Sequence, residues 1–252
     1  MHHRQYVRIV DDSDTSVLMI HGIVGTPDHF DDLIPLIPPS WSVENLLLDG
    51  HGKRVEDFAA SSMAKWKAQV SGCLSEMLDR NQRILLVGHS MGTLFAIQSA
   101  IAYQNAVAGL FLMNVPLRPF IRPAAAAASV RLALGTAGPD DKIAAEMSKD
   151  CSIQLDRHLW KYLHWVPRYA ELLREIRQTR KILPRLRTPC MAFQSGRDEL
   201  VSAAACRDLS QSRCVEMYIL PNSGHFCYCG EDRERLLEKF REMVTRLGSF
   251  SQ

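Results

Sequence analysis

The sequence lacks a long apolar run and lacks a strong excess of charge of one sign. No stretch of its 252 residues approaches the roughly 20 apolar residues that a membrane-spanning helix needs, so stable membrane insertion is not expected. Its 30 basic and 28 acidic residues give a net charge of +2, which offers no reason to expect nucleic acid as a partner. The N-terminal residues lack an apolar signal core with a cleavage site, which predicts a cytoplasmic protein.

The cysteines also lack the spacing of a zinc site or a disulfide framework. They are seven in number, scattered and without a C-x-x-C pair. Cys227 and Cys229 lie close to His225, but two ligands at i and i+2 with no third ligand nearby do not make a zinc site. We expect small half-buried side chains there. The sequence gives no indication of the oligomeric state.

What is present is an alternation of short β-branched apolar runs with longer segments of helical period. This pattern is typical of the α/β class, with a mainly parallel central sheet flanked by helices. The expected strands are Tyr6–Val10, Val17–Ile20, Val43–Leu48, Ile84–Val87, Gly109–Met113, Cys190–Gln194 and Glu216–Leu220. The expected helices are Phe30–Leu36, Met63–Leu78, Gly92–Tyr103, Ala203–Ser210 and Asp232–Leu247.

One segment breaks this alternation. Between about Pro116 and Leu186 there is no convincing strand, only helical patterns interrupted by proline and glycine. Such a segment is too long for a simple connection between two buried strands. We therefore predict a core formed by residues 1–115 and 187–252, with a helical cap, residues 116–186, inserted over the carboxyl edge of the sheet, where open α/β sheets bind ligands.

The segment Gly88–Gly92 reads Gly-His-Ser-Met-Gly and fits the pattern G-x-S-x-G. An ordinary glycine-bounded turn would give the same letters, but here an apolar run precedes the pattern and a helical pattern follows it. This setting is typical of a nucleophile elbow, in which a sharp strand-to-helix turn lifts the serine above the sheet. Ser90 is therefore the candidate nucleophile.

A serine nucleophile needs a base, and in this fold the triad follows the chain order Ser, Asp or Glu, His. His225 follows the last expected strand, and it is the only one of nine histidines after His164. The preceding strand is followed by Asp198 and Glu199. We prefer Asp198, whose shorter carboxylate suits a tight turn, as the group that orients His225, and we keep Glu199 as the alternative.

The oxyanion of acyl transfer needs two backbone N–H donors, one after the nucleophile and one from an early loop. Met91 would supply the first. The early loop is best placed at His21–Pro27, directly after an apolar strand, where glycines allow close approach and Ile23 would present its N–H group.

These segments together resemble the α/β-hydrolase superfamily over the whole chain, and within it the bacterial carboxylesterases and monoacylglycerol lipases. The matching motifs are His-Gly-x-x-Gly at His21–Gly25, Gly-His-Gly at Gly50–Gly52, Trp66 on the following helix, the elbow, Met113–Pro116, and the acid and base segments. The resemblance implies the same triad and oxyanion hole, and a cap of a few helices. Thr93 stands where many relatives carry glycine, and it brings a hydroxyl or a methyl group to the helix start.

We therefore expect a serine hydrolase that cleaves small-molecule carboxylic esters, with short to medium acyl chains or monoglycerides, through an acyl-enzyme. No metal or organic cofactor is implied, because serine, base and backbone donors suffice. An amide or peptide, thioester or carbon–carbon bond hydrolase is the alternative, and a non-catalytic ligand-binding protein is a further one. Cap carboxylates that could hold a substrate ammonium are Glu146, Asp150, Asp156 and Glu171. Apolar cap residues that could form an acyl pocket or hold the cap to the core are Leu132, Leu134, Met147, Leu159, Trp160, Leu163 and Trp165.

Overall fold

The computed structural model describes residues 3–80 and 83–249. Its strands are β1 (Tyr6–Arg8), β2 (Thr15–Ile20), β3 (Ser42–Leu46), β4 (Arg83–His89), β5 (Val107–Met113), β6 (Cys190–Ser195) and β7 (Val215–Leu220). The α-helices are α1 (Val55–Ala59), α2 (Met63–Asp79), α3 (Met91–Ala102), α4 (Pro123–Leu134), α5 (Lys142–Asp150), α6 (Val166–Ile182), α7 (Ala205–Leu209) and α8 (Gly230–Gly248). Short 3-10 helices are η1 (Pro27–Phe30), η2 (Ile34–Leu36), η3 (Leu159–Trp165) and η4 (Leu183–Arg185).

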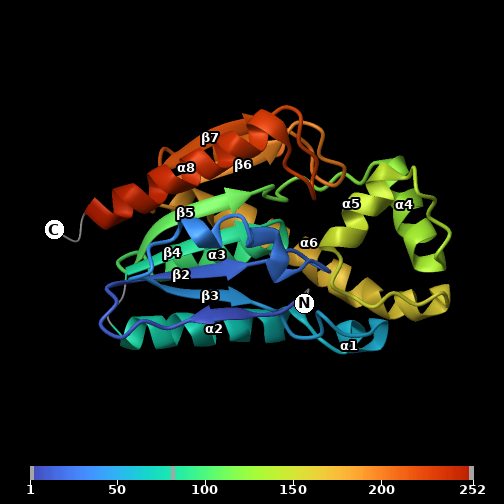
Figure 1. The fold of residues 1–252 in the computed structure, drawn as a ribbon, viewed down its shortest axis with the longest axis horizontal. Coiled ribbons are helices and arrows are strands. Elements are labelled where there is room, and N and C mark those ends of the chain that lie inside the picture. Colours follow the sequence, from blue (N-terminus) through green and yellow to red (C-terminus); the bar gives the residue numbers. More distant parts are fainter. Residues whose placement is uncertain (1–2, 81–82, 250–252) are drawn as a thin grey trace.

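The strands form one sheet in the order β1-β3-β2-β4-β5-β6-β7 (Figure 1). Only β1 pairs antiparallel with its neighbour, and the other pairs are parallel. The chain runs from β2 to β3 on one side and then to β4 on the other, so the order reverses at β2 and β4. Open sheets bind ligands at such a switch point. The predicted fold class is confirmed.

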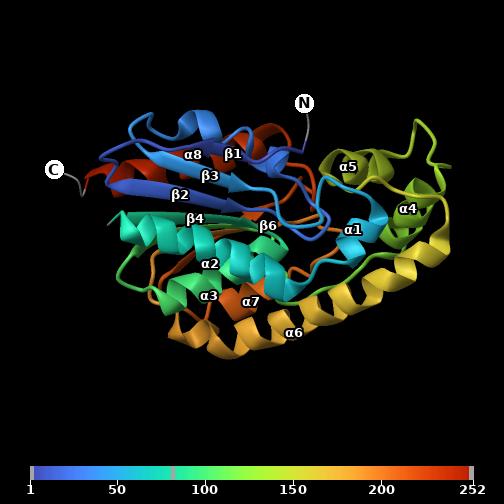
Figure 2. The ribbon, with the colours of Figure 1, turned by 90° about the horizontal axis from the view of Figure 1, so that it is seen from below.

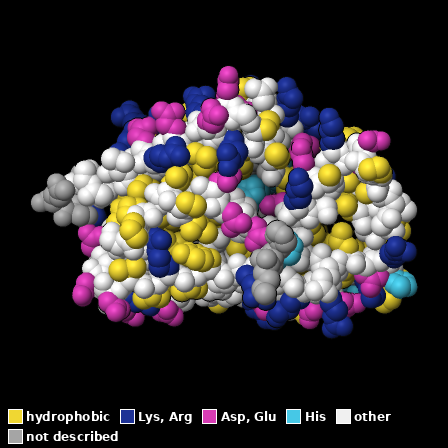
Figure 3. Space-filling model, in the orientation of Figure 1, with side chains coloured by type: hydrophobic (Ala, Val, Ile, Leu, Met, Phe, Trp, Pro, Cys, Tyr) yellow, Lys and Arg dark blue, Asp and Glu magenta, His cyan; other side chains and the backbone are white. Residues whose placement is uncertain are grey.

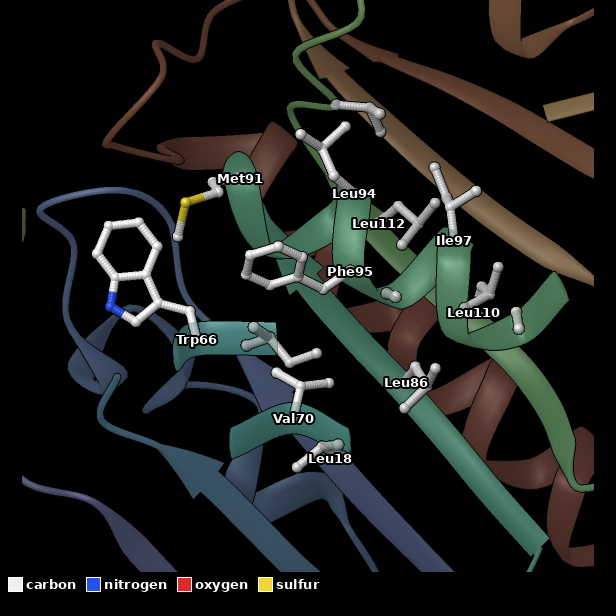
Figure 4. Packing of buried hydrophobic residues seen from close by; sticks show 14 of the residues in the cluster. Leu18, Trp66, Val70, Leu86, Met91, Leu94, Phe95, Ile97, Leu110 and Leu112 are labelled. Atoms are coloured by element: carbon white, nitrogen blue, oxygen red, sulfur yellow. The ribbon is translucent and has the colours of Figure 1, made fainter. Parts of the chain in front are cut away.

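Helices cover both faces of the sheet, as the nearly continuous apolar strands require. On one face α2 and α3 pack on the sheet, and Trp66 of α2 and Phe95 of α3 belong to the same buried cluster as the strand residue Leu86 (Figures 2 and 4). On the other face α8 and the loop with η1 and η2 bury Phe240 and Phe30 against the sheet. The triad candidates therefore stand on loops supported from both sides.

One local expectation is wrong, and one short helix was not predicted. The segment Phe30–Leu36 is not one helix but parts of η1 and η2, because Pro27 and Pro35 limit the backbone hydrogen bonding to short 3-10 turns. No helix was expected at α1, whose five residues bury only Val55 and Phe58 and so give little helical periodicity. All seven expected strands are present, with ends shifted by a few residues.

The segment between β5 and β6 contains α4, α5, η3, α6 and η4 and contributes no strand to the sheet. Figure 1 places α4 and α5 beyond the carboxyl ends of the strands. The helix α6 extends back along α3 (Figure 2), where Gln98 donates a hydrogen bond to the Thr179 hydroxyl at 2.8 Å. The division into core and cap stays a prediction. Among the described residues, no helix is both long and apolar enough to cross a membrane.

Candidate active site

The turn between β4 and α3 has the strained backbone that is typical of a nucleophile elbow. Ser90 has φ 50° and ψ −121°, a conformation that non-glycine residues rarely adopt. A Cβ atom on Gly92 would lie 1.9 Å from the carbonyl oxygen of Ile20, so only glycine lets α3 start this close to β2. The expected strand, turn and helix around Gly88–Gly92 are thus present.

Thr93 contributes its hydroxyl to this turn. Its side chain is fully buried, and Oγ1 donates a hydrogen bond to the Ser90 carbonyl oxygen at 2.6 Å. The same carbonyl oxygen accepts the Thr93 backbone N–H at 3.0 Å, so the hydroxyl adds a second contact to it at the start of α3.

Three side chains from distant parts of the sequence meet at this turn. The Nε2 atom of His225 lies 3.0 Å from Ser90 Oγ, within hydrogen-bond distance. The Nδ1 atom of His225 lies 2.9 Å and 3.0 Å from the two carboxylate oxygens of Asp198. All three residues are at most 8% exposed. With Nδ1 donating to Asp198, Nε2 is left to accept the Ser90 proton.

The carboxylate of Asp198 is itself fixed by the loop that carries it. Its Oδ1 atom accepts hydrogen bonds from the backbone N–H groups of Leu200 and Val201, both at 2.8 Å, and Oδ2 accepts one from Gln194. These three donors fix the orientation of the carboxylate toward His225. Its neighbour Glu199 has a different contact: its Oε2 atom accepts the backbone N–H of His225 at 2.8 Å.

The carbonyl oxygen of His225 is held as well, by two residues to which the sequence gave no role. It accepts hydrogen bonds from His89 Nε2 at 3.0 Å and Asn114 Nδ2 at 3.1 Å. Asn114 has φ 54° and accepts the Ser195 backbone N–H at 2.9 Å. Two features of the sequence pointed to Asn114: it lies in the Met113–Pro116 motif of the family resemblance, and it is an asparagine, which tolerates left-handed backbone angles, directly after a buried strand.

The charges around His225 favour its protonated form. Burial is the largest single influence and acts to lower its pKa, but the charge and hydrogen bond of Asp198, together with the charges of Asp150 and Glu199, outweigh burial and raise the pKa of His225 above 6.5. For His89 burial dominates and holds the pKa well below 6.5. A neutral His89 that donates through Nε2 leaves Nδ1 as an acceptor, and this atom is buried with no partner among the described residues.

The early loop lies directly against the nucleophile. A Cβ atom on Gly22 would be 3.0 Å from Ser90 Cβ, and Gly25 donates its N–H to the Gly22 carbonyl at 3.1 Å. Among residues 3–80 and 83–249, no group accepts a hydrogen bond from the backbone N–H of Ile23 or Met91. Both donors are therefore free for a ligand.

A cavity of about 700 Å³ lies beside His225, lined by His29, Asp150, Phe226 and Tyr228 among others, but not by Ser90. Figure 3 shows histidine side chains in cyan within a hollow of this face, with acidic side chains in magenta near its rim. The side chains of His29, His89 and Asp150 offer nitrogen and oxygen atoms within 4.8 Å of one another.

This cluster is poorly arranged for a metal ion. The rings of His29 and His89 are stacked, with centroids 3.7 Å apart and planes 22° apart. Lone pairs lie in the ring planes, so two stacked rings do not aim at one ion at the short distances of metal–nitrogen bonds. His29 instead donates through Nδ1 to Asp150 at 2.8 Å.

The apolar residues of the 116–186 segment point in different directions. Trp165 is 7% exposed and packs on Phe58 with ring centroids 4.6 Å apart. Trp160 and Leu163 are 61% and 69% exposed and line a separate surface groove that includes Arg168. Trp160 and Leu163 are therefore exposed on the surface, whereas Trp165 is buried against Phe58.

The sheet order and the elbow define the class of this protein as an α/β hydrolase. The chain belongs to the alpha/beta hydrolase family, whose model matches residues 17–239. Among curated protein sequences, none matches this chain.

Solved structures with the same fold include three lipolytic or esterase proteins. One is described with LipS and LipT, metagenome-derived lipolytic enzymes (23% identity, TM-score 0.75, 97% of this chain and 98% of the other). Another is a monoacylglycerol lipase of Paleococcus ferrophilus (16% identity, TM-score 0.65, covering 98% of this chain and 99% of the other). A third is a putative aryl esterase of Burkholderia cenocepacia (18% identity, TM-score 0.62, covering 98% of this chain and 100% of the other). At these identities the likeness shows the fold alone.

Proposed function

We propose that the protein hydrolyses small-molecule carboxylic esters, of short to medium acyl chain or monoglyceride type, through an acyl-enzyme on Ser90. The observation that carries this proposal is the chain of hydrogen bonds from Ser90 through His225 to Asp198. That arrangement is the one by which a serine hydroxyl becomes a nucleophile at neutral pH. The lipolytic and esterase relatives of the same fold agree with it.

In the proposed reaction Ser90 Oγ attacks the ester carbonyl carbon while its proton moves to His225 Nε2. The tetrahedral oxyanion accepts hydrogen bonds from the N–H groups of Ile23 and Met91. His225 then gives its proton to the leaving alcohol as the carbon–oxygen bond breaks. Water, deprotonated by His225, attacks the acyl carbon, and His225 then returns this proton to Ser90 Oγ as the acyl carbon–Oγ bond breaks and the carboxylic acid leaves. Asp198 stays ionised and stabilises the imidazolium in both steps.

Ester substrates suit this site better than substrates with a free ammonium group. Three of the four carboxylates that could bind such a group already have partners: Asp150 contacts His29, Asp156 contacts Lys161, and Glu171 contacts Arg168. For the fourth, Glu146, burial and the nearby Glu199 raise the pKa, which weakens it as an anion.

The test compares Ser90→Ala with Ser71→Ala, a control on the exposed face of α2. Hydrolysis of a p-nitrophenyl ester series by the Ser90→Ala variant is expected to fall at least about 10⁴-fold, with labelling by a fluorophosphonate abolished. Folding is checked by circular dichroism. A Ser90→Ala protein that hydrolyses these esters within tenfold of wild type would refute the role of Ser90.

The bond that is cleaved is tested separately. Relative kcat/KM values for matched esters, thioesters and aminoacyl amides should be highest for the esters. If a thioester or an amide is preferred, the proposed substrate class is wrong while the role of the Ser90–His225–Asp198 chain stands.

A further inference from the structure

We infer that the segment Asp150–Gln154, which leaves the end of α5, holds the loop of Ile23 in position and thereby sets the turnover of the site. We call this segment the strap. The inference rests on the proposed function, because it assumes that the Ile23 N–H stabilises an oxyanion. The new element is that the strap, which lies outside the loops that carry the triad, affects kcat as well as the choice of substrate.

The strap is bonded through its backbone to the two loops that follow β2 and β3. Ser152 donates its N–H to the carbonyl oxygen of Val24 at 3.0 Å. Gln154 donates its N–H to the carbonyl oxygen of Lys53 at 2.8 Å and forms a parallel bridge with Arg54. The first bond reaches the residue directly after Ile23. It therefore fixes the Val24–Gly25 peptide, which lies two peptide units along the loop from the Gly22–Ile23 peptide that carries the proposed oxyanion donor.

The loop of Ile23 needs such a contact because its own structure holds it weakly. Val24 has φ 53°, an unfavourable value for a β-branched residue, and such angles persist only where the surroundings impose them. The one backbone hydrogen bond that closes the loop on itself joins Gly25 to Gly22, among the described residues. The strap also buries Ile153, 4% exposed, in the cluster against which Ile23 and Val24 pack.

A side-chain contact ties the strap to the other end of the same loop. Asp150 Oδ1 accepts a hydrogen bond from His29 Nδ1 at 2.8 Å, and the two side chains are 8% and 4% exposed. His29 lies in η1, directly after the loop, and its ring stacks on His89. Because His89 donates to the carbonyl of His225, the strap is linked to both the oxyanion donor and the base.

These contacts predict an effect on kcat rather than on KM. A displacement of about 1 Å in a group that acts on the transition state can lower the rate about 10²-fold, even when the change lies away from the reacting atoms. The oxyanion donors act mainly in the transition state, so ground-state binding of the ester changes little when they move.

The test removes the bonds one at a time. Ser152→Pro deletes the N–H that reaches Val24, and the extended angles of Cys151, φ −87° and ψ 110°, are those that proline tolerates in the residue before it. Ser152→Ala removes the hydroxyl but keeps the N–H, so the ratio of kcat in the two variants reports the loss of the backbone donor together with the restriction that proline places on φ. Asp150→Ala removes the acceptor for His29, and Asp150→Asn restores an oxygen acceptor.

With p-nitrophenyl butyrate, kcat should be at least about tenfold lower for Ser152→Pro than for Ser152→Ala, with KM within about threefold. The affinity for butaneboronic acid, a tetrahedral mimic, should fall by a similar factor. Asp150→Ala should lower kcat and Asp150→Asn should recover most of the loss. If Ser152→Pro does not fold, the Asp150 pair decides alone.

Equal kcat values in both pairs would overturn the inference, as would a loss confined to KM. Wild-type protein without ester hydrolysis would instead refute the proposed function. A Ser90-dependent wild-type activity that is indifferent to both pairs would refute only the role of the strap.

Discussion

At the scale of single residues, the site fixes His225 at three separate points. Asp198 holds the ring, Glu199 accepts the backbone N–H, and His89 and Asn114 donate to the carbonyl oxygen. Glu199 reaches this position only because residue 224 is glycine, since a Cβ there would lie 2.7 Å from Glu199 Oε1. The two neighbouring carboxylates therefore divide the tasks of orienting the imidazole and holding its peptide.

This division predicts different outcomes for the two amide variants. Asp198→Asn should lower kcat/KM about 10⁴-fold, because an amide can stabilise the wrong imidazole tautomer and no longer stabilises the imidazolium. Glu199→Gln keeps an oxygen that can accept the His225 N–H, so its loss should stay within about tenfold. The measurement is steady-state hydrolysis of p-nitrophenyl butyrate. Equal losses in the two variants would contradict the assignment.

The raised pKa of His225 predicts a pH dependence. The proposed base is active only when neutral, so kcat/KM should fall as pH drops below the folded-state pKa, which lies above 6.5. The fall should approach tenfold for each pH unit. Because the Asp198 carboxylate raises this pKa, the apparent pKa of the residual activity in Asp198→Asn should be lower than in wild type. Profiles of kcat/KM between about pH 5 and 9 measure the apparent pKa in wild type and in Asp198→Asn. If the two apparent pKa values are equal, the Asp198 charge is not what raises the pKa of His225.

Chain order singled out Ser90, His225 and Asp198 as triad candidates, because each follows a recognisable apolar strand, and the structure brings these three side chains into contact. It could not assign the tasks of Asp198 and Glu199, since both are carboxylates on one turn and only the path of the loop separates them. The donors to the His225 carbonyl depend on contacts 111 and 136 residues apart in sequence. No local pattern encodes such contacts.

At the scale of elements, the site depends on how closely α3 approaches the end of β2. Both faces of the sheet are buried, so most of its strands are nearly continuous apolar runs without alternating polar residues. Such runs can be recognised in the sequence. The 3-10 turns at η1 and η2 were not recognised, since apolar residues at helical spacing outweighed the prolines in the reading of Phe30–Leu36. The proline-limited turns and the short helix α1 escaped prediction from periodicity, although the equally short α7 was predicted within Ala203–Ser210.

The close approach of α3 to β2 makes Gly92 irreplaceable, whereas Gly72 on α2 has free space around it, so alanine substitutions at the two positions should have opposite effects. Gly92→Ala would place Cβ 1.9 Å from the Ile20 carbonyl oxygen, so β2 and α3 must separate and the free energy of unfolding should fall by several kcal/mol. Gly72→Ala on α2 meets nothing within 4 Å, and it should stabilise the protein by about 0.5–1 kcal/mol through helix propensity. Urea unfolding measures both. A stable Gly92→Ala protein would contradict the packing of the elbow.

At the scale of the whole molecule, several histidines are buried in their neutral form around the switch point of the sheet. Burial lowers the pKa of His21 to about 4 and that of His51 well below 6.5. Their rings lie 4.7 Å apart, and His21 joins the loops after β2 and β3 by accepting the Leu48 N–H at 3.1 Å. With His89, they connect strand ends that are distant in sequence, and the connection depends on their staying uncharged.

This arrangement predicts a loss of stability in mild acid. Between pH 6.5 and about 4 an unfolded chain protonates His21 but the folded protein does not, so the free energy of unfolding decreases as pH falls through this window. The difference amounts to roughly 3 kcal/mol for His21 alone. His51 and His89 act in the same direction, while the raised pKa of His225 opposes them, because it adds stability below 6.5 that is lost at higher pH.

The measurement is the urea midpoint at about pH 7.5 and 5, which should be clearly lower at the acid value with a similar m-value. Surface carboxylates with lowered pKa values, such as Glu216, lose their contribution only below about 4.5 and leave this window unaffected. His164→Gln, at an exposed position, should keep the full pH difference, whereas His21→Asn should reduce it although the variant is less stable throughout. Equal midpoints at the two pH values in wild type would mean that these histidines already carry charge in the folded protein, and their role as neutral connectors between the strand ends would be wrong.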